Sequence, residues 1–295
     1  MQTKTIKKNI QSKMLNWLET IQDEAIRKEV KDNLVVSGGS ICSLFLNLDV
    51  NDYDVYIQSE AVAFKLAKYY AKAFPELEVV SKSNTPDDVR EEGGGIRGVI
   101  LRNLKEGQVK ILMPESPSGT KTPFENNQEG KYLPVFFSPN AISLSDSLQI
   151  VLRFTGSIEE IHKSFDFVHA TNYFTFKDGL VTNLKAVESI LTKQLFYQGS
   201  LYPLTTIIRI KKFLNRGWKI TAGEQLKVMF QISQLDLTDI ATLEDQIIGV
   251  DVAYFGMLVE ILKEKQDNDP NFKLSYEFLR VIIDKVFSDV DENQE

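Results

Sequence analysis

The hydrophobic positions divide the chain into a strand-rich first part and a helical second part. Apolar residues recur every three or four positions between about residues 3 and 32, which predicts one or two amphipathic helices. Short β-branched or alternating segments predict strands at 33–37, 52–58, 77–80 and 148–154. After about Asn183 the strand signals stop and helical spacing continues. We therefore predict an α/β (α+β) domain over residues 1–183 and an all-helical domain over residues 184–295.

Capping and turn signals add further elements. Ser157 and Glu160 have the spacing of a capping box, which predicts the start of a helix. Further strand patterns predict a strand at 165–169 and hairpins at 99–113 and around 177–179. The proline, glycine, serine and asparagine content of residues 114–130 predicts a long loop.

The composition is that of a globular chain. Of its 295 residues, 43% are hydrophobic and 25% are charged, which excludes collagen, coiled coil and disorder. Acidic residues outnumber basic ones by 41 to 34, giving a net charge of −7. No apolar run approaches the roughly 20 residues of a membrane span, and the polar N-terminus lacks the apolar centre of a signal peptide. We expect a soluble protein that stays in the cytoplasm and does not contact membrane.

Cysteine and histidine are scarce. The single cysteine, Cys42, permits no internal disulfide, and two histidines are too few to build a Cys/His zinc site. Any catalytic metal must therefore be bound by carboxylates, which favours Mg²⁺ or Mn²⁺.

The most informative segment joins a glycine turn to a pair of aspartates. Gly38, Gly39 and Ser40 follow a short strand and open a helix, a position where backbone N–H groups can approach a phosphate closely. Asp52 and Asp54 then occupy alternate positions of the next predicted strand, so both carboxylates should lie on one face. Such a pair beside a phosphate-binding turn is suited to metal-assisted nucleotidyl transfer.

This segment resembles the nucleotidyltransferases of the DNA polymerase β superfamily. It is most similar to the branch of tRNA nucleotidyltransferases and poly(A) polymerases, in which the helix after the glycines leads to Val-x-Asp-x-Asp, here Val50-Asn-Asp52-Tyr-Asp54. The resemblance implies a catalytic head with a mixed, mostly antiparallel sheet. One difference is that Cys42-Ser43 stands where that branch usually has Arg-Asp, so a triphosphate contact is missing.

A second resemblance to the same branch lies in Tyr202–Ile220, where proline, a basic segment, phenylalanine and a closing glycine occur in the family's order. It implies that Arg209 and Lys212 contact the nucleotide. The chain is also similar to phage-encoded members of the superfamily.

Polymerase β-type sites often take a third carboxylate from a neighbouring strand, and the resemblance makes Asp166 the candidate. The alternative is a structural aspartate bonded to a nearby hydroxyl or backbone group. His169 is expected in the core, and His162 at the surface of a charged helix.

Basic residues gather after the predicted catalytic head. Lys211, Arg216 and Lys219 could track an RNA backbone, with Trp218 or Tyr202 stacking on a base. The alternative is an ordinary solvated helix face.

These patterns predict transfer of a nucleoside monophosphate from a nucleoside triphosphate to a hydroxyl, with Asp52, Asp54 and Asp166 as catalytic metal ligands. The resemblance favours an RNA 3′ end as acceptor. Two alternatives remain: a catalytically inactive nucleotide- or RNA-binding protein, and a toxin-type transferase that modifies a protein or small molecule.

Overall fold

The chain divides into two compact units, Met1–Thr192 and Lys193–Glu295. The computed structural model describes residues 2–86, 101, 104–113, 119–124, 131–237, 239, 242–243, 246, 261–262, 264–265, 268–269, 272 and 274–291. The division falls one helix after the boundary predicted at Asn183, because α8 (Leu184–Thr192) lies in the first unit. Among the described residues, no helix has the length and apolar character needed to cross a membrane.

Unit 1 is built on a mixed sheet. Its eight strands run in the order β10-β9-β1-β2-β8-β7-β6-β5, and only the β2–β8 pair is parallel among the pairs described. The mixed, mostly antiparallel sheet of the prediction is therefore confirmed. The strands span β1 Leu34–Ser37, β2 Tyr53–Ile57, β5 Thr120–Lys121, β6 Pro134–Ser138, β7 Ala141–Leu144, β8 Leu148–Val151, β9 Tyr173–Thr175 and β10 Gly179–Val181.

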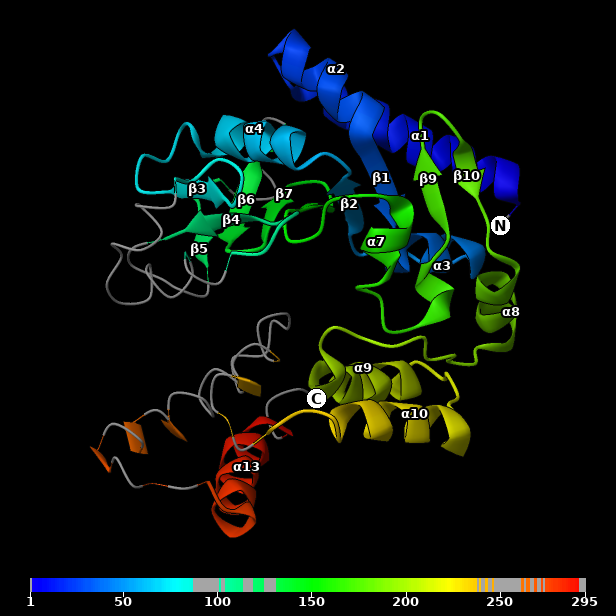
Figure 1. Ribbon diagram of the computed structural model, residues 1–295. Helices are drawn as coiled ribbons and strands as arrows, with labels where there is room; N and C mark the ends of the chain where they lie inside the picture. The colour runs from blue at the N-terminus through cyan, green and yellow to red at the C-terminus, as the bar shows by residue number, and fades with distance from the viewer. Residues whose placement is uncertain are drawn as a thin grey trace. The chain divides into compact units, whose positions relative to one another are not determined.

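Three helices lie over one face of this sheet (Figure 1): α1 (Thr3–Thr20), α2 (Glu24–Asn33) and α4 (Glu60–Ala71). The apolar stripe of α1, which includes Ile6, Ile10 and Met14, is fully buried. It belongs to the same hydrophobic core as the sheet residues whose side chains point toward the helices, such as Val55 and Ile150. This core leaves the alternate residues of the same strands on the opposite face of the sheet.

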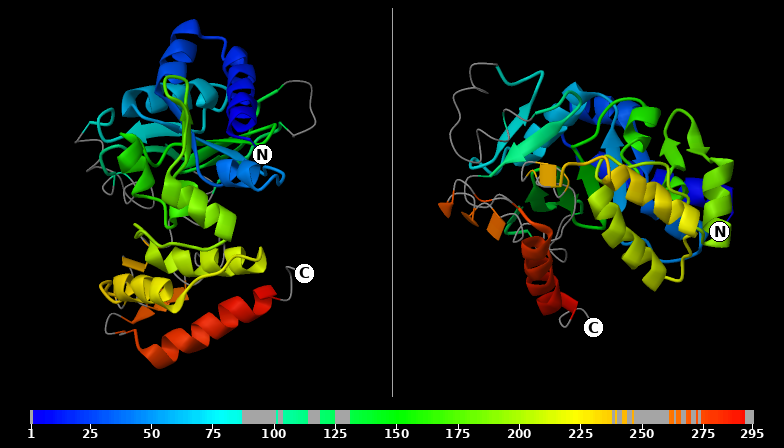
Figure 2. Two further views of the ribbon diagram at one scale, coloured as in Figure 1. Left: turned by 90° about the vertical axis from the view of Figure 1, so that its right-hand side faces the viewer. Right: turned by 60° about the horizontal axis from the view of Figure 1, so that its bottom comes forward.

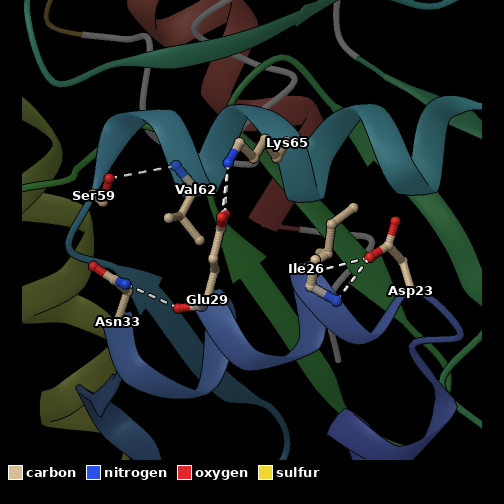
Figure 3. Close-up of polar contacts among 8 residues, drawn as sticks. Asp23, Ile26, Glu29, Asn33, Ser59, Val62 and Lys65 are labelled. Atoms are coloured by element: carbon tan, nitrogen blue, oxygen red, sulfur yellow. Dashed lines mark hydrogen bonds and ion pairs between the residues drawn. The ribbon is translucent and has the colours of Figure 1, made fainter.

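Polar contacts cap α2 and α4 and link the two helices (Figure 3). Asp23 accepts hydrogen bonds from the backbone of Ala25 and Ile26 and so caps α2, while Ser59 caps α4 through the N–H of Val62. Lys65 pairs with Glu29 across the two helices at 2.8 Å. Because this pair is exposed, it contributes only about 0–1 kcal/mol, and burial of the apolar stripes determines the packing.

Several strands differ from those predicted. The strand β4 (Val109–Leu112) pairs with β3 (Glu78–Ser81) in a separate two-stranded sheet, a partner that the hairpin predicted at 99–113 did not include. Its first arm lies largely outside the described residues, and Leu101 is helical. The strands β6 and β7 were not predicted, and β5 interrupts the predicted loop at 114–130.

The segment 165–169 is not a strand. It contains a bend followed by a 3₁₀ helix, η1 (Val168–Ala170). The helix before it, α7 (Ile158–His162), begins with the predicted capping box: Ser157 Oγ accepts from the N–H of Glu160, whose carboxylate accepts from the N–H of Ser157. Figure 2 shows the chain from two further sides, with α1 in dark blue next to the N-terminus.

Unit 2 contains the helices α9 (Pro203–Asn215), α10 (Ala222–Ile232) and α13 (Tyr276–Asp291) among its described residues. Pro203 starts α9, as expected for a residue that has no N–H to leave unpaired. An isolated bridge joins Gln194 to Lys219. Trp218 packs edge-on against Phe213, with ring centroids 5.4 Å apart.

Candidate functional site

The glycine turn lies between β1 and α3 (Gly39–Phe45). Gly38 has φ +90° and ψ −150°, a conformation that residues with a side chain rarely adopt. Its N–H donates to the carbonyl of Ala170 at 3.0 Å. The left-handed residue is therefore Gly38. At Gly39 a Cβ would meet nothing within 4 Å, so the space beside Gly39 is open to a ligand.

The turn lies directly against Asp54. A Cβ built on Gly38 would lie 3.2 Å from Oδ2 of Asp54, a contact tighter than most side chains make. The antiparallel pairing of β1 with β2 produces this approach, since Val36 is opposite Val55 and Asp54 is the next residue of β2 on the side where β1 ends and the turn begins. The structure thus brings together the predicted phosphate-binding turn and one member of the predicted aspartate pair.

The two aspartates repel each other electrostatically. Asp54 is partly buried, and desolvation of its carboxylate, followed by the negative charge of Asp52, raises the pKa of Asp54 to about 7. Asp52 is exposed and immediately precedes β2. A divalent cation would relieve both the burial of charge and the repulsion. Asp52 and Asp54 are therefore the residues that would hold Mg²⁺ or Mn²⁺.

Ser40 is the third member of the predicted turn. Its side chain is 2% exposed, and its hydroxyl has no hydrogen-bond partner among the described residues. A buried hydroxyl of this kind normally has a partner, so a ligand group at the turn would satisfy it.

A hydrogen-bond network holds the turn in place. The hydroxyl of Ser37, fully buried at the end of β1, lies 3.1 Å from the carbonyl oxygen of Ala170, 2.9 Å from that of Asn172 and 3.0 Å from Nε2 of His162. The prediction that His162 lies at the surface is wrong: it is partly buried and packs against Phe165. Burial lowers the pKa of His162 to about 4.

His169 is buried, as predicted, and its ring stacks on Phe167. Burial lowers its pKa to about 4 as well. Both histidines are therefore neutral at pH 7.

Asp166 is buried at 4% exposure in the bend that precedes η1, not in a central strand. Within the described residues, no three His, Cys, Asp or Glu side chains form a group that could hold a metal ion. Asp166 therefore does not join Asp52 and Asp54 in a three-carboxylate cluster in this structure. Its role as a catalytic ligand stays a prediction.

The residue beside Asp54 on the neighbouring strand is Gln149. In the parallel β2–β8 pair, Asp54 is opposite Gln149. Sequence reasoning missed this residue because the pairing of β2 with β8 is not local. Had the partner strand been known, the alternation of Leu148 and Ile150 toward the core would have placed Gln149 on the face of Asp54.

The predicted basic residues lie in unit 2. Lys211, Lys212, Arg216 and Lys219 are exposed and Arg209 is partly exposed, at α9 and just beyond it. Trp218 and Tyr202, predicted to stack on a base, are each only 5% exposed, so they belong to the packing of this unit instead. The roles of the five cations stay predictions.

Comparison with known proteins assigns a family. The sequence model of the Gabija anti-defense 2 family matches residues 8–193, more than half of the chain. The chain belongs to the Gabija anti-defense 2 family. Within this family, the Gabija anti-defense 2 protein of Bacillus phage SPbetaL7 is 20% identical to it over 281 residues, which cover 92% of this chain and 56% of the phage protein. The chain therefore spans little more than half the length of this relative.

This member of the Gabija anti-defense 2 family is also similar to solved structures of tRNA-processing enzymes. A Thermotoga maritima CCA-adding enzyme complexed with tRNA has 14% identity and a TM-score of 0.40, covering 95% of this chain and 68% of that one. A tRNA nucleotidyltransferase complexed with a primer tRNA and an incoming ATP analogue has 15% identity and a TM-score of 0.36, covering 92% and 71%. The Bacillus stearothermophilus CCA-adding enzyme in complex with CTP has 12% identity and a TM-score of 0.34, covering 80% and 50%.

Proposed function

We propose that this chain is a metal-dependent nucleotidyltransferase that acts in phage anti-defence. The observation that carries the proposal is the approach of Asp54 to Gly38, which places a carboxylate pair beside a turn suited to phosphate. Membership of the Gabija anti-defense 2 family supports the biological role.

In the proposed reaction, an acceptor hydroxyl oxygen forms a bond to the α-phosphorus of a nucleoside triphosphate. The bond from that phosphorus to the bridging oxygen breaks, pyrophosphate leaves with the electron pair, and the hydroxyl proton passes to water. A bound divalent cation would neutralise phosphate charge and lower the pKa of the hydroxyl. Gly39 gives the phosphates access to the backbone, Ser40 offers its hydroxyl, and Asp52 and Asp54 hold the cation.

An RNA 3′ end is the acceptor that we propose first. Its support is the group of exposed cations at α9, which suits a phosphate backbone. These cations include Lys211 and Arg216, while Arg209 and Lys212 are proposed to contact the nucleotide.

A protein acceptor is the second candidate. The family name favours it, because a protein that acts against a defence needs a target in that defence. The third candidate, nucleotide or RNA binding without turnover, is favoured by Cys42-Ser43, where the polymerase β branch usually has Arg-Asp, and by the amide of Gln149 opposite Asp54.

The decisive experiment incubates the full chain with each α-labelled nucleoside triphosphate and Mg²⁺, with and without RNA or host lysate, and locates the label. Asp52→Asn and Asp54→Asn should each lower transfer by at least about a hundredfold, because an amide keeps the shape but loses the charge that holds the cation. Asp32→Asn, an exposed change in α2, is the matched control and should retain transfer. Unchanged transfer by either site variant at limiting Mg²⁺ would overturn the assignment.

A further inference from the structure

A row of polar side chains crosses the sheet beside Asp54. Asp54 on β2 is opposite Gln149 on β8, and Gln149 is opposite Ser143 on β7. Their sequence neighbours, among them Val55 and Ile150, are fully buried in the core beneath. Side chains alternate along a strand, so the three polar residues share the opposite face. All three are only partly buried.

The amide of Gln149 has a defined orientation within this row. Its Nε2 donates to Oγ of Ser143 at 3.3 Å. Since the amide is planar, this bond turns Oε1 away from β7. Adjacent side chains on one face of neighbouring strands lie about 5 Å apart, so this oxygen can share a ligand with the carboxylate of Asp54.

An amide oxygen is a neutral, hard ligand of the kind that Mg²⁺ and Mn²⁺ accept. With Gln149 in place of a third acid, the ligand set of Asp52, Asp54 and Gln149 carries two negative charges, which one divalent cation neutralises. A second cation would have no protein charge to compensate it. The phosphates of a nucleotide would have to supply that charge.

We infer that Gln149 is a binding residue that contributes a neutral oxygen to the cation held by Asp52 and Asp54, so that the protein without nucleotide binds a single divalent cation weakly. This inference rests on the proposed function, because it takes the aspartate pair as the metal site. Ser143 is the positioning residue, since its hydroxyl holds the nitrogen end of the amide.

The test measures Mn²⁺ binding to the full chain without nucleotide, by calorimetry and by electron paramagnetic resonance. Gln149→Met keeps the size but removes the oxygen, and it should weaken Mn²⁺ binding by roughly tenfold. Gln149→Glu adds a third negative charge beside the cation, and it should tighten binding by at least roughly tenfold. Gln11→Met, an exposed change in α1, should leave binding unchanged.

Ser143→Ala should weaken Mn²⁺ binding by a smaller factor, and Gln149→Glu should remain tighter than wild type in that background. Circular dichroism and the thermal unfolding midpoint establish that each variant is folded. If Gln149→Met does not fold, the Gln149→Glu variant alone tests the inference.

The outcomes separate this inference from the proposed function. If Asp52→Asn and Asp54→Asn abolish Mn²⁺ binding but the folded Gln149→Met protein binds as wild type does, Gln149 is not a ligand and the inference fails alone. If Gln149→Glu keeps the wild-type affinity, the inference also fails. If the aspartate variants bind Mn²⁺ like wild type, the aspartate pair is not the metal site and both proposals fail.

Discussion

Asp54 combines two requirements that oppose each other. Its burial against Gly38 positions the carboxylate beside the turn, but the same burial and the charge of Asp52 raise its pKa to about 7. Near neutral pH the side chain without metal is therefore partly protonated. A cation must displace that proton, so we expect metal affinity to fall as the pH decreases below about 7.

The raised pKa also predicts how stability depends on pH. Because the folded pKa lies above that of an unfolded aspartate, the folded state holds more protons between about pH 4 and pH 7, and the free energy of unfolding falls as the pH rises through this window. In EDTA, Asp54→Asn should therefore be more stable than wild type at pH 8, by on the order of a few kcal/mol, and similar to it near pH 4.

Urea unfolding of both proteins across this pH range measures the effect. The difference between the proteins is the informative quantity, because His162 and His169 act in the opposite direction. Their folded pKa values near 4 lie below that of an unfolded histidine, so they remove stability as the pH falls. A difference that does not change with pH would contradict the raised pKa of Asp54.

The two glycines of the turn should respond differently to substitution. Gly38→Ala should lower the free energy of unfolding by about 1–3 kcal/mol, because its φ of +90° is strained for alanine and the new Cβ crowds Asp54. Gly39→Val should fold normally but bind nucleotide more weakly, since its side chain fills the open space beside the turn. Chemical denaturation and equilibrium nucleotide binding measure the two effects. Equal loss of stability in both variants would show that the space at Gly39 is not open.

At the scale of elements, structure that depends on a local sequence signal was predicted well, and the pairing of strands distant in the sequence was not. The capping box of α7 depends on Ser157 and Glu160 alone, and both of its hydrogen bonds are present. The segment 165–169 has the alternation of a strand, but its continuation is held by Gly38 and Ser37, which bind the carbonyl of Ala170. Contacts so distant in the sequence leave no local pattern, and for the same reason the strand partner of β4 was not predicted.

The candidate site shows the same difference between local signals and long-range contacts. Asp52, Asp54 and the glycine turn were identified from spacing along one stretch of chain. Gln149 and Ser37 were missed because their significance depends on strand pairing and on a buried network.

The network around Ser37 should stabilise the link between β1 and η1. Ser37→Ala removes the hydroxyl and leaves two carbonyl oxygens and a histidine nitrogen without this partner, so the free energy of unfolding should fall by about 1–3 kcal/mol. Nucleotide affinity should fall as well, because the carbonyl of Ala170 also holds Gly38. Ser138→Ala, which loses two hydrogen bonds within the β6–β7 turn, should change nucleotide affinity little. If both variants bind nucleotide equally well, the network is only structural.

At the scale of the whole molecule, charge is unevenly distributed. The chain carries a net charge of −7, yet Lys211, Lys212, Arg216 and Lys219 are all exposed within a short stretch. A local cationic region in an acidic protein limits nonspecific binding of nucleic acid while leaving one surface for it.

If these residues track RNA, the logarithm of the RNA affinity must fall with the logarithm of salt concentration, by about 0.7 for each single-strand phosphate neutralised. Charge reversal at Lys211 and Lys219, two of the residues proposed to bind RNA, should flatten that slope and weaken all RNA sequences alike. The control reverses Lys4 and Lys8, which are exposed in α1, and so has the same net charge. Fluorescence anisotropy across a salt series measures the slopes. If the wild-type protein shows no salt-dependent binding of RNA, RNA is not the acceptor.

The anchoring of the turn has a consequence for how the protein is made. Ser37 bonds to His162, to Ala170 and to Asn172, which follow it by 125, 133 and 135 positions along the chain. Contacts between such distant segments form slowly, since a long loop must close before they can contribute. On the ribosome, β1 therefore emerges long before the segment that fixes its end, and the catalytic geometry proposed for Asp54 becomes available only when synthesis of unit 1 is nearly finished. A partly synthesised chain would accordingly carry no transferase activity.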